Sequence, residues 1–308
     1  MYYFIVNPNS RSGKGALIWK ELRRTLRQKH ISYKAVFTGY RGHAVKLAAS
    51  ITAKASLEHP VYLIAVGGDG TIQEVLSGVK DLSCIYFGYI PTGSGNDFCR
   101  SMQLPQDPHE ALDCILKRKH IASMDVPVIS IKGRKSHFAI SCGIGFDAAV
   151  CHEVSVTPMK KILNRVGLGK LVYLFVALKQ LLFLKPVPVT LRMDEERIYP
   201  FHKVYFAAVM NQKYEGGGFK FCPDASPSDG YLDVIVVDGL SKLKVLFCLP
   251  TAFWGKHTQF TGIHIFRCKK VEVFSTVPLA VHKDGESAGI QETFSVSIEK
   301  EPVKIILP

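Results

Sequence analysis

The sequence lacks the signatures of several common kinds of site. Its eight cysteines include no CxxC pair, which argues against a zinc ribbon and a redox dithiol. No GxxxxGKS or GxxxxGKT loop is present, because Lys14 is followed by Gly15, and no GxGxxG follows the first expected strand. None of the eleven histidines lies in an HExxH motif. P-loop nucleotide hydrolysis, ordinary dinucleotide dehydrogenation and zinc-dependent chemistry are therefore not predicted.

Long apolar runs and a secretory leader are missing as well. The six residues before Asn7 are too few for the apolar region of a signal peptide, so we expect a cytoplasmic protein. The most apolar stretch covers residues 162–184, and its longest unbroken apolar run is 171–178, whereas a spanning helix needs about 20 residues. This stretch is either a buried helix or a helix that lies on a membrane surface.

Acidic residues are few. Lys and Arg number 39 against 26 Asp and Glu, a formal net charge of +13. A surplus of this size indicates a polyanionic partner, which could be nucleic acid, nucleotide phosphates or an acidic membrane face. The apolar share of 47% is typical of a globular chain, and 308 residues correspond to about two domains.

The order of the expected elements divides the chain. Over residues 1–122, short apolar strands alternate with helices, which predicts an α/β domain with a parallel, Rossmann-like sheet. Residues 123–308 hold many strands and few helices, which predicts a mostly antiparallel β-sandwich. Its last strand could pack back toward the first domain. We expect strands at 126–131, 137–142, 187–193, 204–210, 232–237, 271–274, 279–282, 294–298 and 303–307, and helices at 159–184 and 242–254.

Loops rich in Gly, Ser and Asn follow three strands of the expected parallel sheet. They are NPNSRSGKG (7–15), GGDGT (67–71) and PTGSGNDF (91–98). Because parallel strands end at one edge of a sheet, the loops should converge on one crevice. Glycines let backbone amides face an anion, and a helix N-terminus adds positive potential. A phosphate-rich ligand is therefore predicted, although a plain glycine turn with Asp69 as a helix cap is the alternative for the second loop.

With these motifs the chain resembles the diacylglycerol kinase catalytic family, near the small soluble bacterial lipid kinases and more distantly the sphingosine kinases. The resemblance covers essentially the whole chain. It also rests on Thr38 before Gly42-His43-Ala44, on Asp125, on Gly216-Gly217-Gly218, on PDASPSDGYLD (223–233) and on Asp284-Gly285-Glu286. Phosphofructokinases and NAD kinases share a GGDGT-like loop, so it is the combination of motifs that is specific.

The resemblance implies an ATP site in the first domain. Its residues would be Asn7, Ser10, Gly13, Thr38, Gly67, Gly68, Asp69, Gly70, Thr71, Gln73, Ser94, Asn96 and Asp97. Family members usually carry Asn in place of Gln73 and Thr in place of Ser94, and both replacements keep the type of hydrogen bonding. Asp69, with Asp97 and Asp125 as weaker candidates, would organise Mg²⁺ and its waters at the phosphates.

In the second domain the resemblance implies two further sites. Glu286 is the candidate base for the acceptor hydroxyl, with Asp284 nearby, and an exposed Asp-Gly-Glu turn is the alternative. A separate structural Mg²⁺ would be held by Asp229 together with Ser226 and Tyr231, the last two through carbonyl oxygens. For this segment the alternative is a plain Asp-Gly hairpin turn.

These features together predict an ATP-dependent lipid kinase that phosphorylates diacylglycerol, or a similar lipid alcohol, to phosphatidic acid. The motifs bind nucleotide and do not read the lipid, so a sphingoid base, ceramide or another lipid is an alternative acceptor. A catalytically idle nucleotide- or lipid-binding regulator is the alternative from another class. Intact Asp69, Asp97, Asp229 and Glu286 argue against it.

The partners follow from this function. We expect a peripheral protein at an anionic membrane surface, attracted by basic residues, and relatives suggest a homodimer. The basic candidates are Lys160, Lys161, Arg165 and Lys170, with Lys20, Arg23, Arg24 and Arg27 on the first helix. A solvated basic face plus charges that meet ATP is the alternative. Nucleic acid is not an expected partner, because no recognition motif is present.

Overall fold

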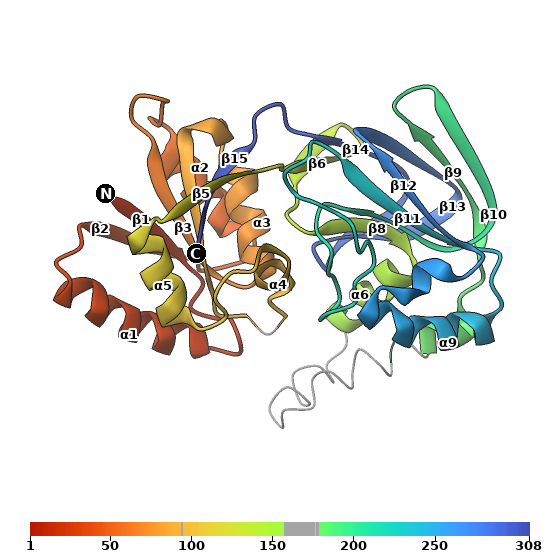
Figure 1. The fold of residues 1–308 in the computed structure, drawn as a ribbon, viewed down its shortest axis with the longest axis horizontal. Coiled ribbons are helices and arrows are strands. Elements are labelled where there is room, and N and C mark those ends of the chain that lie inside the picture. Colours follow the sequence, from red (N-terminus) through yellow and green to blue (C-terminus); the bar gives the residue numbers. More distant parts are fainter. Residues whose placement is uncertain (94, 157–175, 177–178) are drawn as a thin grey trace.

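The computed structural model describes the chain except for residues 94, 157–175 and 177–178. It contains two sheets that lie side by side, one of six and one of nine strands (Figure 1). The first is a parallel-sheet α/β unit and the second an antiparallel β-sandwich, as the sequence predicted.

The first sheet has the strand order β2-β1-β3-β4-β15-β5. Its strands are β1 (Tyr2–Val6), β2 (Tyr33–Phe37), β3 (Val61–Gly67), β4 (Ile85–Pro91), β5 (His120–Met124) and β15 (Val303–Leu307). All neighbours are parallel except β5 and β15, which are antiparallel. The chain therefore returns to the first sheet after building the second one, and β15 separates β4 from β5.

Helices cover both faces of this sheet. They are α1 (Lys14–Gln28), α2 (His43–Thr52), α3 (Asp69–Gly78), α4 (Asp97–Met102) and α5 (Pro108–Lys117). Successive residues of a strand point to opposite faces. Ile64 accordingly packs in a core cluster with α1 and α5, while Leu63 packs in another with α2 and α3. The Asp107 side chain, directly before Pro108, caps α5 by accepting from the amides of His109 and Glu110.

The second sheet contains nine antiparallel strands. They are β6 (Pro127–Ile131), β7 (Arg134–His137), β8 (Ser141–Gly145), β9 (Val187–Met193), β10 (Arg197–Met210), β11 (Leu232–Asp238), β12 (Ile263–Cys268), β13 (Lys270–Lys283) and β14 (Glu286–Ile298). Helices α6 (Phe146–Val156) and α9 (Lys242–Thr251) lie below the sheet in Figure 1, and short 3-10 turns cover 252–254 and 256–259.

Two strand predictions for this domain were wrong. The strand expected at 137–142 is interrupted, because β7 ends at His137 and β8 begins at Ser141. The amides of Ala139 and Ile140 donate to a side chain there and not to a neighbouring strand. The strands expected at 271–274 and 279–282 are one strand, β13, whose register shifts between Phe274 and Leu279, around Pro278. β5, β12, α4 and α6 were not predicted.

The helix expected at 159–184 lies largely outside the described residues. Within its described part, residues 179–183 are helical. Among the helices that the structure describes, none is both long and apolar enough to cross a membrane.

Candidate active site

The three Gly-, Ser- and Asn-rich loops meet at one edge of the first sheet. The Ser10 and Thr92 hydroxyls lie 2.6 Å apart, which joins the first loop to the third. The amides of Thr92 and Gly93 donate to the Gly67 carbonyl at 2.7 and 3.1 Å, which joins the third loop to the second. Gly93 is needed for this approach, since a Cβ there would lie 2.8 Å from the Gly68 Cα. The loops form one continuous rim, as anion recognition by backbone amides requires.

Asp69 is a half-buried residue at the start of α3. Burial of its carboxylate, together with the neighbouring Asp97 and Asp284, raises its pKa to about 7, against the opposing effect of the amides of Asp97 and Phe98. Its Oδ1 finds no hydrogen-bond partner among the described residues. A carboxylate that is crowded by others and left with an open oxygen fits a divalent cation, which prefers such ligands. The described residues therefore suit the expected role of Asp69.

Asp97 connects the two domains. Its Oδ2 accepts from the amide of Gly217 in the second domain at 2.7 Å, and its Oδ1 pairs with Arg100. Burial raises the pKa of Asp97, and the Gly217 amide and the Arg100 guanidinium oppose that rise. The Gly216-Gly217-Gly218 motif thus approaches the Gly-, Ser- and Asn-rich loops, and Asp97 has a positioning role that its place in the sequence did not reveal.

The two acids of the Asp-Gly-Glu turn have different surroundings. Asp284 is fully buried and accepts from the amides of Ala139, Ile140 and Ser141 at 2.8, 2.8 and 3.0 Å. Burial raises its pKa to about 6, and these amides oppose the rise. Asp284 therefore anchors the turn between β13 and β14.

Glu286, on the other side of the turn, faces the first domain. Its carboxylate pairs with Arg41 at 2.8 Å, and a Cβ built on Gly70 would lie 2.6 Å from its Oε1. It lines a cavity of about 240 Å³ together with Arg41, Gln73 and Lys283. Glu286 is thus the accessible acid of the turn, next to the first residues of α3.

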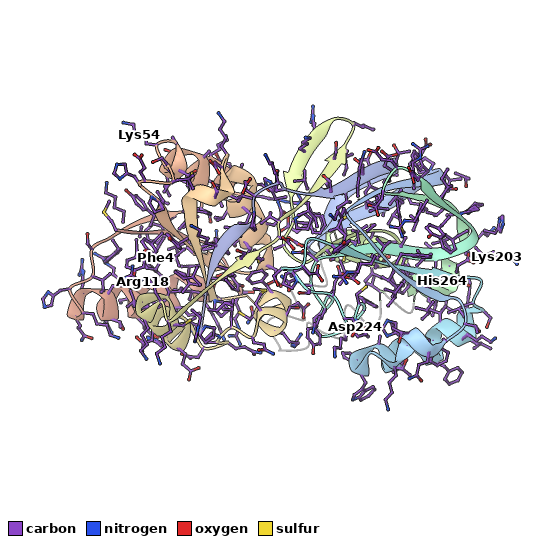
Figure 2. The ribbon with its side chains drawn as sticks, turned by 45° about the horizontal axis from the view of Figure 1, so that its top comes forward. Phe4, Lys54, Arg118, Lys203, Asp224 and His264 are labelled. Carbon is purple, nitrogen blue, oxygen red and sulfur yellow. The ribbon has the colours of Figure 1, made fainter. Side chains whose placement is uncertain are left out.

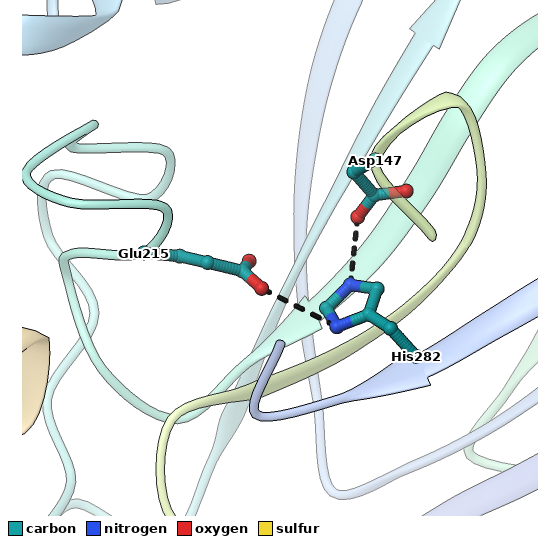
Figure 3. A group of neighbouring side chains, drawn as sticks. All are labelled: Asp147, Glu215 and His282. Atoms are coloured by element: carbon teal, nitrogen blue, oxygen red, sulfur yellow. Dashed lines mark hydrogen bonds and ion pairs between the residues drawn. The ribbon is translucent and has the colours of Figure 1, made fainter. Parts of the chain in front are cut away.

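Sequence reasoning missed a buried cluster beside this turn. His282 lies between two carboxylates, with Nε2 2.8 Å from Asp147 Oδ2 and Nδ1 3.4 Å from Glu215 Oε1 (Figure 3). Burial lowers the His282 pKa, but Glu215 and Asp147 outweigh it and raise the pKa to about 9. Burial raises the pKa of Glu215 to about 7. The three residues come from three elements, and no spacing in the sequence links them.

One ligand atom from each of these three residues could in principle share a metal ion. The two ring nitrogens face different carboxylates, however, so an imidazolium pairs electrostatically with both without an ion, while Nδ1 and Glu215 Oε2 have no hydrogen-bond partner among the described residues. The cluster is better described as a clamp that joins β13, which leads into the Asp-Gly-Glu turn, to Glu215, which precedes the glycine motif.

The expected structural metal site is arranged around charged protein groups. Asp229 pairs with Arg267 through Oδ2 and accepts from the Tyr231 amide through Oδ1 at 3.0 Å. Arg267 also lies 4.5 Å from the Tyr231 ring centroid. The Ser226 hydroxyl lies 3.4 Å from that of Ser228. Both Asp229 oxygens are engaged, so this donor set does not fit a further cation while Arg267 keeps its place.

Asp125 has a related structural role. It accepts from the Gly230 amide at 2.7 Å, and its own amide donates to the Pro227 carbonyl at 2.6 Å. It therefore holds the 223–233 segment.

The remaining predicted nucleotide residues lie on the same rim or next to it. The Asn7 side-chain Nδ2 donates to the Thr71 hydroxyl at 3.4 Å, and the Thr38 backbone amide donates to the Val6 carbonyl at 2.9 Å. Asn96 has a left-handed backbone and a buried side-chain oxygen with no partner among the described residues. Gly13, also left-handed, is the N-cap residue that precedes α1. Ser94 lies outside the described residues.

The comparisons with known proteins identify the family of the chain. A family model described as "Diacylglycerol kinase catalytic domain" matches residues 1–128, and one described as "YegS C-terminal NAD kinase beta sandwich-like domain" matches residues 141–306. The chain belongs to the diacylglycerol kinase-like family of lipid kinases. A relative in this family is the Bacillus subtilis protein named "Putative lipid kinase YtlR", 29% identical over 99% of this chain and 98% of its own. A Mycobacterium tuberculosis diacylglycerol kinase is 29% identical over 91% of this chain and 87% of its own.

Solved structures show that the family fold extends over the whole chain. A Bacillus anthracis protein named "putative diacylglycerol kinase" has a TM-score of 0.74 at 22% identity and covers 100% of this chain and 96% of its own. An Archaeoglobus fulgidus NAD kinase, solved in complex with ATP, has a TM-score of 0.54 at 14% identity over 99% of this chain and 93% of its own. At these identities the likeness concerns the fold.

Proposed function

We propose that the protein transfers the γ-phosphoryl group of ATP to the hydroxyl of diacylglycerol, or of a similar lipid alcohol, to give phosphatidic acid or its analogue. Family membership supports a kinase, and the placement of Glu286 against Gly70 is the observation that carries the reaction. It brings the accessible acid of the second domain to the loop that cradles phosphates in the first.

Each group in the cleft has a separate task in this proposal. The glycine rim binds the ATP phosphates through backbone amides, and Asp69, supported by Asp97, would hold Mg²⁺. Bound there, the ion would neutralise charge that develops on the transferring group. Glu286 accepts the proton of the acceptor hydroxyl, and its ion pair with Arg41 orients the carboxylate. Asp284 does not touch substrate, because its oxygens are bound by three backbone amides.

Peripheral membrane association is part of the proposal, because the acceptor is dissolved in a bilayer. Lys20, Arg23, Arg24 and Arg27 are exposed on α1 and could contribute attraction to anionic lipid. The basic residues at 160, 161, 165 and 170 lie outside the described residues.

A panel of lipid acceptors tests the proposed function. The full chain is incubated with labelled ATP and Mg²⁺ together with diacylglycerol, a sphingoid base, ceramide or monoacylglycerol, and products are separated by lipid chromatography. We expect the largest label transfer to diacylglycerol, and its loss in Glu286→Gln. If the label is transferred preferentially to a sphingoid base or to ceramide, that lipid and not diacylglycerol is the acceptor. If no lipid is labelled, the result favours a catalytically idle regulator.

A further inference from the structure

The region around α9 exposes an unusual number of large apolar side chains. Phe183, Phe247 and Trp254 are 76%, 73% and 71% exposed. With Leu182, Leu243 and Phe253 they form what we call the apolar face. In Figure 2 the side chains of the light-blue helical region project away from the second sheet. Soluble monomers rarely leave contiguous patches of this kind uncovered, and those that do commonly use them for binding.

The pattern along α9 is that of a helix with two apolar sides. Val245 and Cys248 are buried toward the sheet, while Leu243 and Phe247, four residues apart, point outward. Residues 182 and 183 belong to the same region, because the Lys242 ammonium donates to the Leu182 carbonyl. The outward side of α9 does not contribute to the core, so its apolar side chains indicate contact with a binding partner.

The charge within the segment that carries α9 is of one sign. No Asp or Glu occurs between Gly239 and Val271, whereas Lys242, Lys244 and Lys256 lie in this stretch. Aromatic side chains flanked by lysines suit the boundary between anionic head groups and acyl chains. A second copy of the chain suits the face less well, because a two-fold contact would bring the same lysines together, and their own segment supplies no acid to pair with them.

The apolar face also leads to the active site. The Phe253 ring stacks on the Phe219 ring with centroids 4.1 Å apart, and the Lys220 amide donates to the Ala252 carbonyl at 2.8 Å. The preceding Gly217 amide is the one that binds Asp97. A surface bound to the apolar face would therefore lie against the segment that borders the nucleotide-binding loops.

We propose that the apolar face docks the protein on an anionic phospholipid bilayer, with Phe247 and Trp254 inserted at the head-group boundary. This inference rests on the proposed function, because docking would serve to supply the lipid acceptor. Membrane binding itself is measured without ATP. A failure of docking and a failure of catalysis can therefore be told apart.

The first test uses the two tryptophans of the chain. Trp19 is buried and Trp254 is exposed, so Trp19→Phe leaves Trp254 as the single reporter. Vesicles of phosphatidylcholine and phosphatidylglycerol at 7:3 should shift its emission to shorter wavelength, and brominated acyl chains should quench it. Emission that is unchanged at saturating vesicle concentration, without quenching, would overturn the proposal.

The second test compares matched double variants by vesicle co-sedimentation. Phe247→Ser/Trp254→Ser should weaken binding to the 7:3 vesicles about 10-fold or more, because two large apolar side chains are lost. Leu57→Ser/Ile198→Ser removes comparably exposed apolar side chains elsewhere and should bind like wild type. Equal binding of both variants would refute the assignment. So would conversion of a wild-type dimer to a monomer by the first variant with vesicle binding retained, since the occupant would then be a second copy.

Activity provides the third readout. On a short-chain diacylglycerol in detergent micelles, Phe247→Ser/Trp254→Ser should retain wild-type turnover, whereas on 7:3 vesicles its rate should fall in parallel with binding. Equal losses on micelles and vesicles would mean that these residues act on the fold or the active site and not on docking.

Discussion

Gly70→Ala is the substitution that most directly tests how the two domains meet. A Cβ at this position would lie 2.6 Å from Glu286 Oε1 and 3.3 Å from its Cδ. Ordinary carbon contacts are about 3.5 Å or longer, so the carboxylate has to move by about 1 Å. The neighbour that must yield is the end of a flexible side chain, and the fold should accommodate the change.

The expected effects on stability and turnover have opposite signs. Gly70 is the second residue of α3, and alanine in a helix is favoured over glycine by about 0.5–1 kcal/mol. The melting temperature should therefore stay constant or rise by about 1–4 °C. A misplacement of about 1 Å at a reacting group can cost a factor of about 10², so kcat should fall by that order.

The assay is a double-mutant cycle with a control. Turnover on diacylglycerol, ATP affinity and melting temperature are measured for Gly70→Ala, Glu286→Gln and the double variant. If Gly70→Ala acts by displacing Glu286, it should cost little in the Glu286→Gln background. Gly39→Ala is the control, since its Cβ meets nothing closer than 3.7 Å.

Two results would contradict this reasoning. Normal turnover of Gly70→Ala would mean that Glu286 is not held against α3 in the working enzyme. Equal losses in both backgrounds, accompanied by weaker ATP binding, would mean that the methyl group blocks the phosphate site instead.

Three further predictions concern acidic residues of the two domains. Glu286→Gln should lower kcat about 10²-fold with nearly unchanged ATP affinity, and near-normal kcat would remove it as the base. Burial, Asp97 and Asp284 raise the Asp69 pKa to about 7, so its carboxylate prevails only above that pH, and activity should rise with pH through about 7. Asp97→Asn removes one of these charges and should shift this rise to lower pH; an unshifted pH profile would disprove the coupling. If Mg²⁺ displaces Arg267 from Asp229, it should raise the melting temperature of wild type and not of Asp229→Ala, and equal shifts would exclude a cation there.

The sequence predicted what depends on local order along the chain. The glycine loops could be located because they follow apolar strands, and parallel strands place their ends together. The strands at 187–193 and 303–307 were predicted with their observed bounds, since each is a short apolar or alternating run.

The sequence could not show which residues, far apart along the chain, form hydrogen bonds or ion pairs with one another. The strand expected at 137–142 is interrupted because the backbone amides of residues 139–141 donate hydrogen bonds to Asp284, which lies more than 140 residues away in the sequence. The His282 clamp likewise joins positions 147, 215 and 282, which no periodicity connects. Burial decides both cases, because a desolvated carboxylate or imidazole must find partners wherever the fold brings them.

The position of β15 has a consequence for how the chain folds as it is made. Among the residues that the structure describes, β5 pairs in the first sheet with β15 alone, so residues 120–124 cannot join that sheet until residues 303–307 have been synthesised. Domains generally fold in the order in which they emerge from the ribosome. Here the first domain is completed last, after the second has emerged, and the edge of β4 stays open meanwhile. A fragment that ends near residue 128 would keep that open edge permanently, with the aggregation risk of an unpaired strand.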